Sequence, residues 1–136
     1  IAASAAIPAL FRPVQRDGRI LIDGGIYNPV PFGLLEGKAD FVVAIDVVGG
    51  PEGDAGRMPG TIDAMFGASQ LMMQSIVAMK MKAHQPAIFL RPSVSRFRVM
   101  DFLKVNTVLR ETEGIKEELK RAIDAAVTFS QRRIAD

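Results

Sequence analysis

Residues 41–45 form an uninterrupted apolar run, Phe-Val-Val-Ala-Ile, between Asp40 and Asp46. A continuous apolar run bounded by charged residues is typical of a strand that is buried on both faces of a parallel sheet. It is the clearest strand signal in the chain. The sequence therefore predicts a domain that is built around a buried sheet.

Two more strands and two long helices are expected around this run. The segments 19–22 and 87–90 are β-prone and lie between turn-forming residues. A short helix is predicted at about 31–37, and long helices are predicted at 62 to about 83 and at about 103 to 134, where apolar residues recur at three- and four-residue steps. This alternation favours an α/β layered domain with a mostly parallel sheet, and residues 1–136 are assigned to part of a single domain.

The predicted sheet is small for its class. Parallel α/β sheets usually carry about five or six strands with both faces covered, whereas three are predicted here. The chain also opens on Ile1 without an initiator methionine. We therefore expect residues 1–136 to be part of a larger domain whose other strands come from elsewhere.

The composition excludes several classes of protein. The chain has no cysteine, so it contains neither a disulfide framework nor a thiolate nucleophile or metal site. Seventeen Lys+Arg against fifteen Asp+Glu leave a net charge of +2, which is too small to indicate a nucleic-acid partner. The longest apolar-leaning stretch, residues 64–79, is shorter than the roughly 20 residues that a membrane-spanning helix needs.

The first candidate for chemistry is Asp23, which follows the predicted strand at 19–22 and precedes Gly24 and Gly25. The carboxyl end of a strand is where open α/β sheets place ligands and catalytic groups. The two glycines permit unusual backbone angles and the close approach of another backbone. The alternative is that Asp23 caps a turn by accepting hydrogen bonds from nearby backbone amides.

Three blocks of sequence give Asp23 a context. They are Ser-Ala-Ala-Ile-Pro-Ala-Leu-Phe at 4–11, Leu-Ile-Asp-Gly-Gly-Ile-Tyr-Asn-Pro-Val-Pro at 21–31 and Ala-Asp-Phe-Val-Val-Ala-Ile-Asp at 39–46. In this order the blocks resemble the C-terminal signature of bacterial patatin-like proteins. The resemblance continues at Ile-Phe-Leu-Arg-Pro (88–92) and at Asp-Phe (101–102), and so extends over essentially the whole chain.

The resemblance implies a fold and a reaction. The fold is a three-layer α/β/α patatin-like domain, and the reaction is hydrolysis of acyl esters of phospholipids or related lipids. In that family the aspartate of Asp-Gly-Gly or Asp-Gly-Ala works with the serine of a Gly-x-Ser-x-Gly elbow, so Asp23 is implied as the base that activates the serine. Gly24 and Gly25 complete the motif. The resemblance implies neither a metal ion nor a cofactor.

The serine partner is not in this chain, because no Gly-x-Ser-x-Gly occurs in the sequence. In family order the nucleophile and the oxyanion loop lie upstream of residue 1, in an N-terminal part that is expected to complete the domain. His84 is the one histidine, and its place beside Lys80 and Lys82 at the end of a predicted helix favours a solvated side chain over a catalytic one. Alone, residues 1–136 are expected to be inactive.

Other interpretations stay open. One is a non-catalytic patatin-like remnant that binds a lipid or a protein. Another is a nucleotide-binding domain, although the glycines at 50, 53 and 56 fit neither common phosphate-loop spacing. The methionines of the helix at 62–83 predict core packing or, alternatively, an acyl-chain groove or a peripheral membrane contact. By resemblance to bacterial relatives, the protein is expected in the cytoplasm or at a membrane surface.

Overall fold

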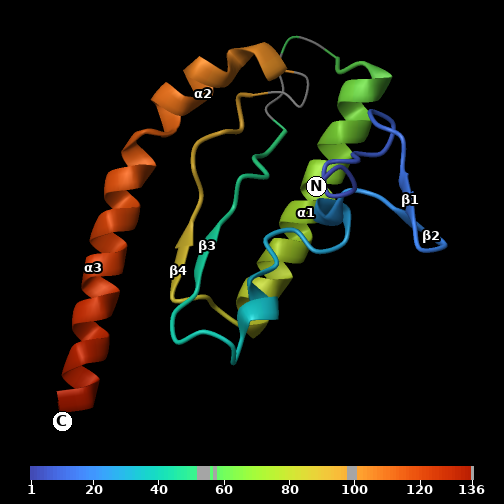
Figure 1. The fold of residues 1–136 in the computed structure, drawn as a ribbon. Coiled ribbons are helices and arrows are strands. Elements are labelled where there is room, and N and C mark those ends of the chain that lie inside the picture. The colour runs from blue at the N-terminus through green and yellow to red at the C-terminus, as the bar shows by residue number, and fades with distance from the viewer. Residues whose placement is uncertain (52–55, 57, 98–100, 136) are drawn as a thin grey trace.

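The computed structural model of the chain describes residues 1–51, 56, 58–97 and 101–135. Their elements run in the order β1 (Val14–Arg16), β2 (Arg19–Leu21), η1 (Gly24–Ile26), η2 (Phe32–Leu35), β3 (Val43–Ile45), α1 (Thr61–Ala83), β4 (Ile88–Leu90), η3 (Phe102–Lys104), α2 (Val105–Thr112) and α3 (Gly114–Ala135). Figure 1 shows α1 and α3 on opposite sides of the β3–β4 pair.

Strands β3 and β4 form a parallel pair, as the sequence predicts. Ala44 lies opposite Phe89 in the middle of the pair, and the backbone N–H of Asp46 donates to the carbonyl of Leu90 at 2.8 Å. Because parallel strands need a long crossover, the 23 residues of α1 make the connection between them. The chain is therefore an α/β structure with a parallel sheet.

An ion pair between the buried carboxylate of Asp46 and the half-exposed side chain of Arg91 closes the carboxyl end of the two strands. The carboxylate of Asp46, which is 1% exposed, accepts hydrogen bonds from Nε of Arg91 at 2.9 Å and from Nη2 at 2.7 Å. Its other oxygen accepts from the backbone N–H of Val48 at 3.0 Å. Asp46 thus joins the first residue after β4 to the loop after β3.

The strand at 19–22 does not join the parallel sheet. Its residues 19–21 form β2, which pairs antiparallel with β1, a strand that the sequence did not predict. Asp17 and Gly18 make the two-residue turn between them with φ of 51° and 71°, the positive angles that a type I′ hairpin requires. In Figure 1 this hairpin projects away from α1 on the side opposite β3 and β4. The expectation that Asp23 follows a strand of the parallel sheet was therefore wrong.

Much of the apolar surface expected in the core is exposed. In β3 only Ala44 is buried, and Ile45 is 42% exposed, so burial on both faces was wrong within the described residues. Of the residues in α1 only Val77 is buried, and the core-packing prediction was wrong for three methionines that are exposed: Met65, Met72 and Met79. No helix in the described part of the chain is long and apolar enough to cross a membrane.

The last predicted helix is divided in two. Helix α2 ends at Thr112 and α3 begins at Gly114, and Figure 1 shows the helix axis changing direction between them. Glycine is the weakest helix former after proline, which accounts for the break at this point. Helix α3 then packs along β4.

Removal of Arg91 tests the ion pair with Asp46. Arg91→Met leaves the buried Asp46 carboxylate without its cation, and we expect the free energy of unfolding to fall by about 2–4 kcal/mol in chemical denaturation. Arg16→Met is the matched control, because Arg16 and Asp17 form an ion pair whose side chains are 76% and 86% exposed. The control should change stability by no more than about 0.5 kcal/mol. Equal losses in both variants would contradict the assignment.

Candidate active site

Asp23 occupies the N-cap position of η1, directly after the hairpin. Its Oδ1 accepts a hydrogen bond from the backbone N–H of Gly25 at 2.7 Å. Its own backbone N–H donates to the carbonyl of Ala6 at 3.0 Å, and Ala6 is buried. The aspartate is thus tied on both sides, to the turn that follows it and to the N-terminal segment.

The capping alternative from the sequence is therefore present in the structure, and it leaves half of the carboxylate open. Among the residues that the structure describes, Oδ1 of Asp23 has a hydrogen-bond donor and Oδ2 has none. The side chain is half-buried. One oxygen fixes the orientation of the carboxylate while the second can accept a proton from another group.

The two glycines of the motif differ in their surroundings. A Cβ on Gly25 would lie 2.9 Å from Oδ1 of Asp23 and 3.5 Å from Sδ of Met73, whereas a Cβ on Gly24 would meet nothing within 4 Å. Neither glycine has a positive φ, so the unusual backbone angles expected from the sequence are not used. Gly25 instead provides space for the carboxylate and for α1.

Helix α1 supports the segment after Asp23 through one face. Met73 lies below Gly25, and Lys80 lies two turns further along the same face. The Nζ of Lys80 donates to Oδ1 of Asn28 at 2.6 Å and to the carbonyls of Pro29 at 3.0 Å and Val30 at 2.7 Å. Burial lowers the pKa of Lys80 from its ordinary value of 10.5.

Sequence reasoning missed Lys80 as a residue of this site. The available signal was its position seven residues after Met73 and three after Val77, which places a cation on the apolar face of the helix. His84, by contrast, lies where expected: it is exposed at the end of α1, and its Nδ1 lies 3.0 Å from Oε1 of Glu36. Nothing places it beside Asp23.

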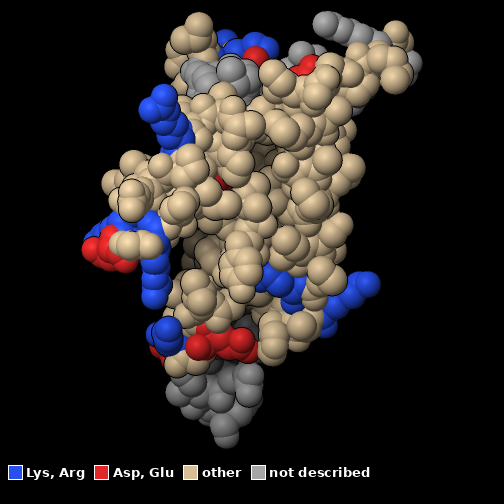
Figure 2. Space-filling model, turned by 90° about the vertical axis from the view of Figure 1, so that its right-hand side faces the viewer, with Lys and Arg blue, Asp and Glu red and all other residues tan. Residues whose placement is uncertain are grey.

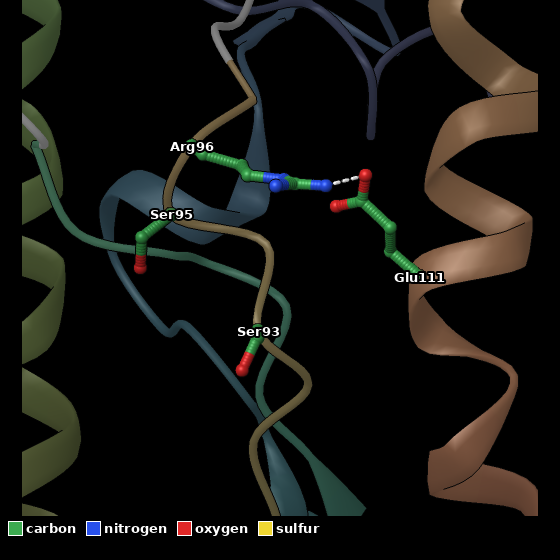
Figure 3. Close-up of a pocket in the computed structure, with 4 residues that line it drawn as sticks. All are labelled: Ser93, Ser95, Arg96 and Glu111. Carbon is green, nitrogen blue, oxygen red and sulfur yellow. Dashed lines mark ion pairs between the residues drawn. The ribbon is translucent and has the colours of Figure 1, made fainter.

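Apart from the turn at Asp23, the chain has a cavity between the segment after β4 and helix α2. This cavity of about 370 Å³ is lined by Ser93, Ser95, Arg96 and Glu111. Figure 3 shows that Arg96 and Glu111 point toward each other across it, and the two form an ion pair. The Oγ of Ser95 accepts from the backbone N–H of Gly50 at 3.0 Å. Among the described contacts, neither serine hydroxyl is hydrogen-bonded to Glu111, the carboxylate of this cavity, which pairs with Arg96 instead.

The described residues contain no group of three His, Cys, Asp or Glu side chains that could hold a metal ion. The site formed by this chain is thus a single oriented carboxylate on a turn supported by α1. Such a group can act as a general base if a nucleophile approaches its free oxygen.

Two substitutions separate the capping role of Asp23 from any chemical role. Asp23→Ala removes the acceptor for the Gly25 N–H, and we expect the free energy of unfolding to fall by about 1 kcal/mol. Asp23→Asn keeps a side-chain oxygen at the same position and should change it by less than about 0.5 kcal/mol. Chemical denaturation measures both. If the two variants were equally unstable, the cap would depend on charge rather than on the hydrogen bond.

The turn at Asp23 lies within a segment that matches a known family. Residues 1–35, which include Asp23, Gly24 and Gly25, match the sequence model of the family described as patatin-like phospholipase. An uncharacterized NTE family protein of Mycobacterium bovis is 43% identical to the chain over 56 residues, which are 40% of this chain and 16% of the relative.

Relatives with the same description in Mycobacterium tuberculosis have the same identity and the same coverage. The matching segment thus spans only 16% of the length of these relatives. With the parallel strand pair, the family match and these relatives agree on one assignment. The family match over residues 1–35 and these relatives support a patatin-like assignment for the chain.

Proposed function

We propose that this chain supplies the acidic member of a Ser-Asp dyad in a hydrolase that cleaves acyl ester bonds of phospholipids or related lipids. The observation that carries the proposal is the carboxylate of Asp23, which has one oxygen fixed by the Gly25 N–H and the other open. It lies in the segment that matches the patatin-like phospholipase family. The serine belongs to a Gly-x-Ser-x-Gly elbow in another part of the same protein.

In this reaction the free oxygen of Asp23 takes the proton of the serine hydroxyl as the serine oxygen attacks the ester carbonyl carbon. The carboxyl group then gives the proton to the leaving alcohol oxygen as the ester C–O bond breaks. In the second half, Asp23 takes a proton from water, which attacks the acyl-serine, and returns it to the serine. The cap on Oδ1 keeps the base in one orientation throughout.

The remaining part of the protein is proposed to cover the exposed apolar surface of this chain. Ile45 and Val47, which are 42% and 66% exposed, lie at the end of β3, and Leu71 and Met72 of α1 are 54% and 59% exposed. Several large apolar side chains exposed in this way support the proposal of a contact with another element. Neighbouring strands from an N-terminal part would bury the side chains near β3.

The side of the molecule that lies to the right in Figure 1 has a different character. Figure 2 shows that charged side chains lie mainly at the margins of this side, around an uncharged middle. A face with few charged side chains in its middle supports the proposal that the protein, in the cytoplasm or at a membrane, contacts a membrane surface during the reaction.

The dyad proposal is tested by Asp23→Asn in the full-length protein that carries this sequence. The amide keeps the cap but cannot accept a proton, so we expect kcat/KM on a phospholipid or a short-chain ester to fall by about 10²- to 10⁴-fold. Asp17→Asn is the matched control, since Asp17 is exposed in the hairpin turn. Full activity of Asp23→Asn would reject Asp23 as the base.

The location of the nucleophile is tested by labelling with a fluorophosphonate followed by peptide mass spectrometry. We expect one modified serine, outside residues 1–136, and no adduct on the six serines of this chain, because none of them stands in a Gly-x-Ser-x-Gly motif. Absence of any adduct in the active-site segment of the full-length protein would favour the non-catalytic, lipid- or protein-binding alternative.

A further inference from the structure

The backbone directly after the Asp-Gly-Gly motif is strained. Val30 has φ of 47°, in the left-handed region that a β-branched residue rarely adopts. Pro29 before it is fully buried, and Pro31 follows it. Strained residues of this kind persist only when their surroundings hold them in place. Some contact must therefore keep this segment in its conformation.

Lys80 provides that contact. A lysine ammonium has three donors, and here each has an oxygen acceptor: Oδ1 of Asn28 and the carbonyls of Pro29 and Val30. The ammonium also lies 4.8 Å from the centroid of the Phe32 ring, at cation–π distance. Its donors are used within the protein, so Lys80 is not available to bind a phosphate group of a substrate.

The hydrogen bonds continue from Lys80 to the motif. Asn28 accepts from Lys80 through its side chain and donates its backbone N–H to the carbonyl of Gly24 at 2.9 Å. Gly24 is the residue after Asp23, and η1 packs on the same helix that carries Lys80. Two hydrogen bonds thus connect the ammonium to the turn that orients the carboxylate.

We propose that Lys80 is a positioning residue for Asp23, in that its three hydrogen bonds hold the strained segment 28–30 and thereby set where the free oxygen of the carboxylate lies. This inference rests on the proposed function, because position matters only if Asp23 is the base. It assigns α1 a part in the reaction beyond packing. The charge of Lys80, and not merely its bulk, is what the positioning requires.

The test is removal and chemical restoration of the ammonium in the full-length protein. Lys80→Cys removes it, alkylation with 2-bromoethylamine restores an ammonium at nearly the same reach, and alkylation with iodoacetamide adds a neutral group. Residues 1–136 contain no other thiol, and mass spectrometry verifies the modified position. Lys82→Cys, on the exposed side of the same helix, receives the same treatments as the matched control.

We expect Lys80→Cys to lower kcat on a soluble short-chain ester by about 10- to 100-fold, with KM changed less than about twofold. Aminoethylation should recover most of the loss and the neutral adduct should not, whereas the control should keep its kcat throughout. Wild-type kcat in Lys80→Cys, or equal recovery with both reagents, would overturn the inference. Both kcat and KM are measured well below the melting temperature of each variant, so that general destabilisation does not contribute.

Amide hydrogen exchange of the peptide that covers residues 24–32 separates this inference from the proposed function. Faster exchange in Lys80→Cys, reversed by aminoethylation, is expected whether or not the protein hydrolyses esters. If Lys80→Cys keeps full activity while Asp23→Asn has none, the positioning role is wrong and the dyad stands. If the wild-type protein has no activity, the dyad and the catalytic part of this inference fall together, and hydrogen exchange decides whether Lys80 holds the segment.

Discussion

Helix α1 donates hydrogen bonds to backbone oxygen atoms of two loops, the segment after Asp23 and the loop after β3. These contacts hold the two loops in place. Lys80 binds the segment after Asp23, while Gln74 donates to the carbonyl of Gly49 at 2.9 Å and Gln70 to that of Val48 at 3.3 Å, in the loop after β3. A backbone carbonyl of a loop that loses contact with water on folding needs a hydrogen-bond donor from the protein. The polar side chains of α1 supply these donors, so one helix sets the positions of both loops.

This arrangement explains why so small an apolar core is compatible with a defined site. In the part of the chain that the structure describes, the buried apolar side chains are Ala6, Pro29, Phe32, Ala44, Val77, Ile88, Leu90 and Pro92. Around them, directional hydrogen bonds specify where each loop lies, and the Asp46–Arg91 pair specifies how the two strands end. The packing of a few apolar residues holds the elements together, and the polar contacts fix the positions of the loops and strand ends.

The sequence predicted those elements whose signals are local. The helix at 61–83 and the strands at 43–45 and 88–90 lie within a few residues of their predicted positions, because apolar periodicity and turn-forming residues are properties of short segments. It did not predict β1, whose residues Val-Gln-Arg carry no alternating apolar pattern and which exists through its pairing with β2. It also overestimated the burial of β3, which depends on neighbours far away in the chain.

The candidate site likewise has features that the sequence predicts locally and features that depend on tertiary contacts. The Asp-Gly-Gly motif could be recognised from its neighbours in sequence, whereas the partner of Asn28 could not, because Lys80 is 52 residues further along. The different surroundings of Gly24 and Gly25 could not be predicted from the sequence either, since only the fold places Met73 beside Gly25. The motif can be identified from a short stretch of sequence, whereas the contacts that support it come from residues far away in the chain.

The β3–β4 pair has one more consequence. Within the part of the chain that the structure describes, each strand is hydrogen-bonded to the other alone, so each has one edge without a strand partner, and helix α3 packs along β4. Natural sheets protect such edges because they recruit strands from other molecules. A polypeptide of residues 1–136 handled by itself would accordingly self-associate as its concentration rises, adding strand to strand at the two edges, and its solubility would report on whether those edges are covered.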